Sequence, residues 1–398
     1  MRTNQTKHIF LLVIVGFLLA SCVSPQIITV EVTATPAPTT VPTSSPTPPW
    51  PTEDWRYASP ESLGMDSNVL VELLKSIENR EIDIDALIVA RNGSIVLDAT
   101  VFPFSIFPDA RHEVFSCTKS VLSILIGIAI DKYYIEGVDQ PVLSFFPEKS
   151  VANLDARKEI MTLEHLLTMT TGLACNDSYI YGWDGLHKMW ASPDWVQFML
   201  DMPMAGDPGS YFKYCNGASF LLSAILQEAT GVSAFEFAQK HLFTPLGISD
   251  VVWESNPQGI SIGYSELELR PKDMAKIGYL YLNDGIWDGE QIVSSTWVQD
   301  STQKHIPGTL QEWYGYQWWV DESGIYMALG YGGQYIIVVP EEGLVVVFVS
   351  DLAEEDFYIP DQFLDRYILP SIKSSDPLPE DSRATTLLRL YRLALQDR

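Results

Sequence analysis

The chain has few of the residues from which metal and nucleotide sites are built. It contains four cysteines and six histidines in 398 residues. The histidines stand singly, and neither a C-x-x-C nor an H-E-x-x-H spacing occurs, so metal chemistry is not expected. No G-x-G-x-x-G or Walker sequence occurs either, which argues against a nucleotide cofactor. We therefore expect an enzyme or binding protein with no metal and no cofactor.

Basic residues are also scarce. The chain has 25 Lys and Arg against 51 Asp and Glu, which gives a formal net charge of −26. A surface this acidic repels nucleic-acid backbones and anionic lipid headgroups. We therefore expect no nucleic-acid partner, and the charge otherwise indicates only good solubility.

The N-terminal segment is typical of a targeting signal. A basic start precedes an apolar stretch, Ile9 to Ala20, which is too short to span a bilayer comfortably. The ending Leu19-Ala20-Ser21-Cys22 resembles a bacterial lipoprotein signal, in which the cysteine becomes the lipid-bearing first residue. We expect a signal peptide over residues 1–21, lipidation of Cys22, and an extracytoplasmic protein anchored to the cell membrane. The alternatives are an ordinary secretory signal or a short membrane anchor.

A tether and one domain are predicted to follow. Residues 33–52 are almost all Thr, Pro, Ser and Ala, a composition that stays extended and does not fold. We expect a tether over residues 22–52, a globular domain over residues 53–372 and a mobile C-terminal tail over residues 373–398. No second linker and no internal repeat occurs, so a single domain with two lobes is expected.

The most informative stretch is Ser116-Cys117-Thr118-Lys119, followed at once by an apolar run that ends at Ile130. The run is apolar on all sides and predicts a buried helix with Ser116 at its start and Lys119 one turn later on the same face. A serine nucleophile needs a base, and a desolvated lysine with a lowered pKa can be that base. The free N–H groups of the helix start can stabilise an oxyanion. The tetrapeptide alone also fits a plain helix N-cap followed by a solvated lysine.

The order of the other elements indicates the fold. An Asn92-Gly93 turn predicts a hairpin of strands at 86–91 and 94–101, while the remaining strands come late. The other predicted helices are 66–79, 162–170, 195–200, 218–229, 234–242, 272–282, 295–301 and 357–369, and the late strands are 314–320, 325–329, 335–339 and 344–349. We expect an α/β (α+β) fold, with an antiparallel sheet built from both chain ends, flanking helices and a central, mostly helical lobe. The long loop over residues 173–193 is expected to rim a site.

Six stretches between Trp55 and about Pro370 carry a joint resemblance. They are FSCTKS (115–120), LEHLLTMTTGL (163–173), KYCNGASFLLSAIL (213–226), PLGISD (245–250), RPKDMAKIGYLYLNDG (270–285) and GYGGQYIIVVP (330–340). Together they resemble the serine β-lactamase and penicillin-binding protein superfamily, most of all its class C-related branch with esterases and 6-aminohexanoate-dimer hydrolases. The resemblance implies a β-lactamase/transpeptidase-like fold.

The resemblance also implies roles for individual residues. Ser116 matches the nucleophile and Lys119 its lysine partner. In Tyr214-Cys215-Asn216, which matches a Y-x-N element, Tyr214 would shuttle the proton to the leaving group and Asn216 would hold a substrate amide or carbonyl. The segment after 173 would pass near this element, so a Cys175–Cys215 disulfide is expected, with Cys117 left as the free thiol. The alternative is that both cysteines are small buried residues.

The third element departs from the pattern of the superfamily. Tyr331-Gly332-Gly333 stands where relatives carry Lys-Thr-Gly or His-x-Gly. The glycines let the backbone approach a substrate, and the N–H of Gln334 is expected to join that of Ser116 as an oxyanion hole. The cation that would grip the carboxylate of a β-lactam or a peptide is missing, which favours neutral esters or amides as substrates.

The sequence therefore predicts a serine hydrolase that acts on a small ester or amide through an acyl-enzyme. The alternative is a penicillin-binding or receptor-like module that acylates without efficient turnover. One competing motif, Gly259-Ile260-Ser261-Ile262-Gly263, fits the G-x-S-x-G elbow, which needs a strand before it and a helix after it. Ser255-Asn256-Pro257-Gln258 precedes the motif and an acidic stretch follows it, so we predict a loop there.

Overall fold

The computed structural model describes residues 50–175, 177 and 184–397. They belong to one unit that runs from Pro48 to Arg398. The predictions of a signal peptide, of lipidation at Cys22 and of most of the tether lie outside the described residues.

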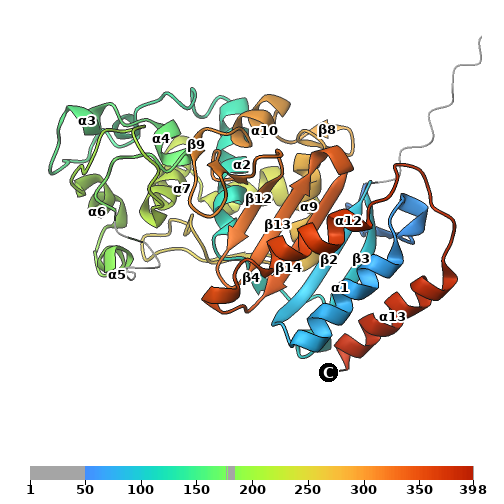
Figure 1. The fold of residues 1–398 in the computed structure, drawn as a ribbon. Helices are drawn as coiled ribbons and strands as arrows, with labels where there is room; N and C mark the ends of the chain where they lie inside the picture. Colours follow the sequence, from blue (N-terminus) through green and yellow to red (C-terminus); the bar gives the residue numbers. More distant parts are fainter. Residues whose placement is uncertain (1–49, 176, 178–183, 398) are drawn as a thin grey trace, which may run out of the picture. The chain divides into compact units, whose positions relative to one another are not determined.

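A nine-stranded sheet is built from both ends of the described chain (Figure 1). Every neighbouring pair is antiparallel except the parallel pair of β1 and β3. In spatial order the strands are β1 (Arg56–Tyr57), β3 (Ser94–Thr100), β2 (Ile84–Arg91), β14 (Leu344–Ser350), β13 (Gln334–Val339), β12 (Tyr326–Gly330), β11 (Trp319–Val320), β10 (Trp313–Tyr314) and β9 (Ile306–Pro307). The predicted fold class is confirmed, because β2 pairs with β14 and so joins the early hairpin to the late strands.

The hairpin of β2 and β3 turns where the sequence predicts. Asn92 and Gly93 have φ values of 48° and 78°, the left-handed values that a two-residue hairpin turn needs. Residues 314–320, predicted as one strand, instead form the antiparallel pair β10 and β11. The reversal contains the buried Gln317, whose φ is 62° and whose side-chain amide donates to Leu166 O and Leu167 O. Hydrogen bonds to the helical lobe thus stabilise a chain reversal between β10 and β11 that strand propensity does not predict.

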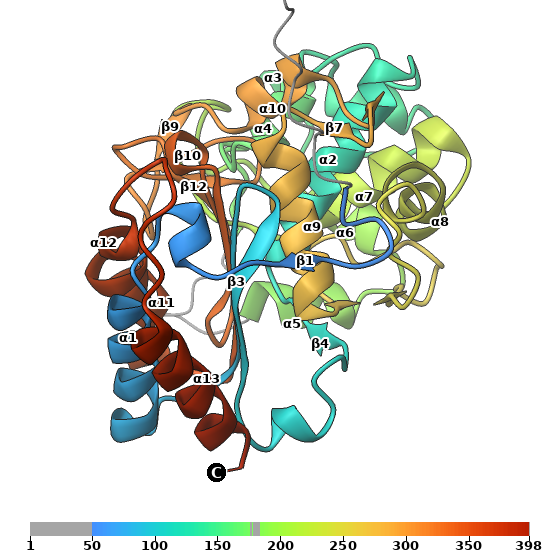
Figure 2. The same ribbon diagram turned by 90° about the vertical axis from the view of Figure 1, so that its right-hand side faces the viewer.

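Helices cover both faces of the sheet (Figure 2). On one face lie α1 (Ser67–Arg80), α11 (Ile359–Phe363), α12 (Leu369–Ser371) and α13 (Ser382–Gln396), and on the other lie α2 (Cys117–Asp131) and α9 (Pro271–Leu282). The Asp66 carboxylate caps α1 by accepting the Asn68 N–H. With helices on both faces, the central strand β14 is buried along its whole length, as its run of valines requires.

The C-terminal segment is more ordered than the sequence predicts. Residues 373–398, expected to be a mobile tail, contain the 15-residue helix α13. Its apolar positions Ala384, Leu388 and Leu395 are buried, and the helix lies beside α1. This segment is therefore part of the domain, because its helical stripe finds an apolar surface on which to pack.

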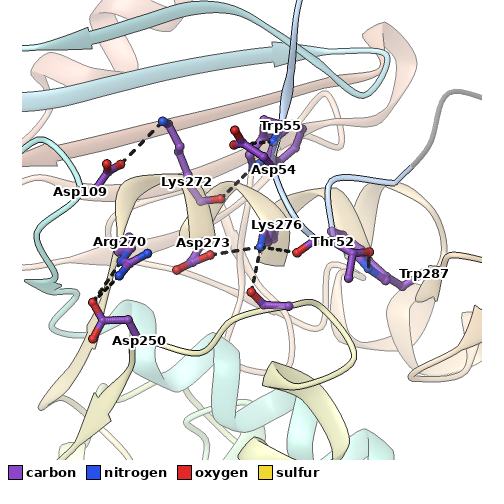
Figure 3. A network of polar contacts seen from close by, with 11 residues as sticks. Thr52, Asp54, Trp55, Asp109, Asp250, Arg270, Lys272, Asp273, Lys276 and Trp287 are labelled. Carbon is purple, nitrogen blue, oxygen red and sulfur yellow. Dashed lines mark hydrogen bonds and ion pairs between the residues drawn. The ribbon is translucent and has the colours of Figure 1, made fainter.

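The end of the predicted tether also packs on the domain (Figure 3). The Trp50 ring lies 5.3 Å from the rings of both Tyr279 and Trp287. The buried Lys276 donates to Thr52 O at 3.2 Å, and Trp287 Nε1 donates to Thr52 Oγ1 at 2.8 Å. The packed domain therefore begins at or before Trp50, ahead of the predicted boundary at residue 53.

The middle of the chain forms the expected helical lobe. Its helices are α3 (Ala156–Glu159), α4 (Leu163–Leu167), α5 (Asp184–Trp190), α6 (Trp195–Asp201), α7 (Asn216–Thr230) and α8 (Ala234–Ala238). The remaining elements are α10 (Ser295–Ser301), the small sheet of β4 (His112–Glu113), β6 (Leu267–Leu269) and β5 (Val252–Trp253), and the pair β7 (Ile286–Trp287) and β8 (Glu290–Gln291). No single described helix has the length and composition to cross a membrane. The bent pair of α7 and residues 234–243 meets both criteria only when the two are joined, and most of α7 is buried in the domain.

Candidate active site

The start of α2 presents Ser116 to a cavity of about 620 Å³. The residue before it, Phe115, has a φ of 45°, which is strained for a bulky side chain. Its ring packs edge-on against the Tyr331 ring at 5.6 Å. The Ser116 side chain makes no capping bond to the helix, and in the described part of the chain its N–H makes no hydrogen bond. In the described part of the chain, neither the hydroxyl nor the N–H of Ser116 is therefore used to cap the helix.

Lys119 lies one turn into α2, as the spacing predicts. Its Nζ is 2.8 Å from Ser116 Oγ and donates a second hydrogen bond to Tyr264 O at 2.8 Å. The side chain is 1% exposed. Burial lowers the pKa of Lys119 well below the usual range of a lysine, and the nearby Asp177 carboxylate opposes this shift. A lysine amine that is neutral and hydrogen-bonded to a hydroxyl can accept the hydroxyl proton.

Tyr214 completes the cluster around Lys119. The lysine Nζ lies 4.9 Å from the centre of the Tyr214 ring, and this ring stacks on Trp319 at 6.1 Å. Tyr214 also lines the cavity, so the structure brings together the three residues to which the sequence assigns chemistry. The third residue of the Y-x-N element, Asn216, is buried at the start of α7, and its N–H donates to the Asp177 carboxylate.

A disulfide joins Cys175 to Cys215, with their Cα atoms 5.9 Å apart. This is the pairing that the family resemblance suggested. It ties the residue after Tyr214 to the start of the loop that carries Asp177. Cys117 is the free, buried cysteine, and its Sγ donates to Gln334 O at 3.4 Å. Burial raises the pKa of the Cys117 thiol, so this thiol is inert.

The end of β12 and the turn that follows it form another wall of the cavity. Gly330 approaches the segment before Ser116 so closely that a Cβ there would lie 2.4 Å from Val114 O. Gly330, Tyr331 and Gly332 line the cavity.

Gly333 in this turn and Gln334, the first residue of β13, are not among the described residues that line the cavity. The buried side chain of Gln334 donates to Ser350 O and Tyr331 O. Gly333, with a φ of 85°, packs against Leu352.

The cavity walls are mostly apolar and aromatic. Besides Tyr214 and Tyr331, the apolar and aromatic lining residues are Phe212, Leu310, Trp319, Leu329, Leu352, Phe357 and Tyr358. Three charged residues of the described chain also line it: Asp177, Lys213 and Glu354. Leu352 to Tyr358 come from the segment after β14, to which the sequence assigned no role in a site.

Sequence reasoning missed Tyr264 and Asp177. Tyr264 contributes its backbone carbonyl to Lys119, and its hydroxyl accepts a hydrogen bond from Trp190 Nε1 at 2.7 Å. Burial raises the pKa of the Asp177 carboxyl, which accepts the Asn216 N–H at 2.9 Å. Tyr264 acts through its backbone carbonyl, so no sequence motif could have identified it. Asp177 could have been suspected, because it lies in the loop predicted to rim the site.

The competing motif around Ser261 belongs to the framework. Ser261 is fully buried; its hydroxyl accepts the Phe235 N–H at 3.1 Å, and its carbonyl accepts the Ser223 hydroxyl at 2.8 Å. The segment makes only an isolated bridge between Ser255 and Ser261, and no helix follows it directly. The strand–turn–helix that a nucleophile elbow needs is absent from this described segment.

Comparison with known proteins agrees with this geometry. The family model described as "Beta-lactamase" matches residues 77–366. The 6-aminohexanoate-dimer hydrolase of Paenarthrobacter ureafaciens is 25% identical over 325 residues, which cover 75% of this chain and 81% of that protein. A monacolin J acid methylbutanoyltransferase of Aspergillus terreus is 32% identical over 122 residues, 29% of this chain and 28% of that protein.

Solved structures show the same fold. A putative 6-aminohexanoate-dimer hydrolase from Bacillus anthracis superposes with a TM-score of 0.64 at 21% identity, over 81% of this chain and 89% of that chain. EstCE1, a hydrolase with promiscuous acyltransferase activity, also gives 0.64, at 16% identity, over 76% of this chain and 99% of that one. The chain belongs to the beta-lactamase family, in its class C-related branch.

Proposed function

We propose that this protein is a serine hydrolase that cleaves small esters or amides through an acyl-enzyme. The observation that carries the proposal is the 2.8 Å contact between Lys119 Nζ and Ser116 Oγ, made by a lysine whose pKa burial lowers well below its usual range. The printed functions of the relatives, a dimer hydrolase and an acyltransferase, are reactions of the same acyl-transfer class.

The steps follow from the positions of the side chains. Neutral Lys119 takes the Ser116 hydroxyl proton as Oγ attacks the substrate carbonyl. The Ser116 N–H and a second backbone N–H from the turn after β12, with Gln334 as the predicted donor, stabilise the oxyanion. Tyr214 passes the proton to the leaving group, which departs as an alcohol or amine. Water then gives a proton to the Lys119 and Tyr214 relay as its oxygen attacks the acyl carbonyl, the acyl group leaves as a carboxylic acid, and the relay returns the proton to Ser116 Oγ. Asn216, Tyr331, Gly332 and Gly333 are the predicted contacts to the substrate.

Esters and amides are favoured over β-lactams because of the cavity lining. Among the described lining residues the only cation is Lys213, whose charge stabilises the Asp177 carboxylate. A substrate carboxylate would meet Asp177 and Glu354 as well as this one lysine.

Pre-steady-state kinetics with a p-nitrophenyl ester test the proposal. We expect a burst equal to the enzyme concentration, followed by steady turnover, both absent in Ser116→Ala. The double variant Ser116→Ala/Tyr214→Phe is expected to be little worse than Ser116→Ala alone, because the residues act as a unit. A stoichiometric burst without turnover would favour the penicillin-binding alternative. Turnover that survives in Ser116→Ala, or that EDTA abolishes, would refute the mechanism.

We further propose that the enzyme works outside the cytoplasm on a lipid anchor at Cys22. The proposal is supported by the Leu19-Ala20-Ser21-Cys22 ending and the Thr/Pro-rich segment after it. Cys22→Ala is expected to release active enzyme from the membrane fraction. Mass spectrometry of the mature N-terminus decides the matter, since an unmodified start at another residue would contradict lipidation.

A further inference from the structure

The segment after β14 forms one end of the cavity and carries a carboxylate without a partner. Leu352, Glu354, Phe357 and Tyr358 all line the cavity. In the part of the chain that the structure describes, the Glu354 side chain makes no hydrogen bond and no ion pair. The other acid of the cavity, Asp177, accepts the Asn216 N–H and is stabilised by Lys119 and Lys213. Glu354, which is exposed to solvent, is therefore a lining carboxylate for which the described chain supplies no partner.

Aromatic rings also line the cavity. Phe357 and Tyr358 stand edge to face, with ring centres 5.4 Å apart, and Trp319 lines the cavity as well. Ring faces carry negative electrostatic potential, so aromatic walls beside a carboxylate favour a positive guest, above all an alkylammonium group.

Hydrogen bonds hold this segment against the site. The Leu352 N–H donates to Gly332 O at 2.9 Å, which fixes the segment to the turn beside Ser116. The buried Tyr335 places its hydroxyl 3.0 Å from Phe357 O and 2.9 Å from Asp361 Oδ2. Glu354 begins the short 3₁₀ turn Glu354–Asp356 between these two attachments. The backbone that carries Glu354 is thus held beside the turn that lines the cavity next to Ser116.

We propose that the cavity selects esters or amides that carry an ammonium group, and that Glu354 is the residue that makes the selection. This inference rests on the proposed hydrolase function and names its substrate class. The net charge of −26 acts in the same direction, because it draws cationic substrates to the protein and repels anionic ones.

Matched substrates test the proposal. One p-nitrophenyl ester has an acyl chain that ends in trimethylammonium, and its partner ends in the uncharged tert-butyl group of the same shape. A second pair carries the same two groups on the alcohol side. We expect the wild-type enzyme to prefer the cationic member of at least one pair by about three- to tenfold in kcat/KM. Added salt should reduce this preference.

Two variants distinguish an effect of Glu354 itself from an effect of the negative net charge of the protein. Glu354→Gln should abolish the preference, because kcat/KM for the cationic ester falls to about the value for its neutral partner. Glu355→Gln removes the same charge from the next residue, which is exposed like Glu354 but is not among the described lining residues, and should keep the preference.

The outcomes distinguish this inference from the function on which it rests. Neutral-ester turnover with no cation preference in either pair would overturn the inference alone. The inference also falls if the preference is the same in Glu354→Gln and wild type. No turnover of any ester, with no burst at Ser116, would overturn the hydrolase proposal itself.

Discussion

Lys119 and Lys158 are both buried lysines, 1% and 0% exposed, and burial lowers the pKa of each. They lie in different regions and meet different partners. Lys158, in the helical lobe, donates to Ala152 O at 3.1 Å and to Leu200 O at 2.7 Å, so it joins a loop to the end of α6. Lys119 meets one backbone carbonyl, Tyr264 O, and one hydroxyl, Ser116 Oγ.

The difference shows that burial alone does not make a lysine a base. A carbonyl oxygen has no proton to give, so the Lys158 contacts can only hold structure. A hydroxyl has one, and the Ser116 hydroxyl also borders the cavity. The nature of the acceptor and its access to a substrate distinguish the two lysines.

The largest expected effect comes from replacing the two lysines in parallel. Lys119→Met should lower kcat for a p-nitrophenyl ester by at least about a thousandfold, because the base is lost. Lys158→Met should leave kcat within about twofold but lower the free energy of unfolding by about 1–3 kcal/mol, since the part-buried Ala152 carbonyl and the buried Leu200 carbonyl lose their donor. Ester kinetics and denaturant titrations measure the two effects. Equal losses of kcat in both variants would remove the distinction.

Removal of the disulfide should affect both activity and stability. The Cys175→Ala/Cys215→Ala variant opens a bridge with a sequence separation of 40. In the chain-entropy model this lowers the free energy of unfolding by about 4 kcal/mol. Ester activity should also fall, because the bridge braces the Tyr214 segment. Thermal melts with and without reductant measure the loss, and Cys117→Ala is the matched control. Alkylation of all three thiols without reduction would show that the bridge does not form.

The pH profile should follow Lys119 alone. The active form is the neutral amine, so kcat/KM is complete above the pKa of Lys119 and falls about tenfold per unit below it. Because burial lowers the pKa of Lys119, this fall should occur well below the usual titration range of a lysine. The profile of Lys158→Met should coincide with that of the wild type. A limb at the ordinary lysine pKa would contradict the assignment of Lys119 as a desolvated base.

The smallest expected effect extends the comparison from lysines to serines. Ser261→Ala removes a hydroxyl that accepts only the Phe235 N–H. Ester kcat/KM should stay within about twofold of wild type, with a loss of at most about 1–3 kcal/mol of stability. Fluorophosphonate labelling should persist in Ser261→Ala and vanish in Ser116→Ala. Labelling of Ser261 instead would reverse the roles of the two motifs.

Local patterns predicted much of the fold and the site. The S-x-x-K spacing placed Lys119 within 2.8 Å of Ser116, because helical residues three apart share a face. The Asn92-Gly93 turn and the alternation of apolar segments predicted the hairpin and the late strands of the sheet. Tyr214 needed the family resemblance, since a lone tyrosine before a helix carries no signal of its own.

Contacts between segments distant in sequence could not be predicted in the same way. Tyr264 O reaches Lys119 across 145 residues. The buried side chain of Gln334 and the acid at Glu354 take their positions from the packing of residues 350–358 on the turn after β12. Helix α13 looked like a tail because its apolar stripe has meaning only beside α1.

The sequence by itself determined which residues share a helix face, where the hairpin turns and which serine has a lysine beside it, because these depend on backbone geometry over a few residues. The tertiary structure decided how deeply Lys119 is buried, which backbone carbonyl holds it, and which lining carboxylate has no partner in the described chain. Desolvation and cavity charge depend on every segment that packs around a site, and no short stretch of sequence contains that information.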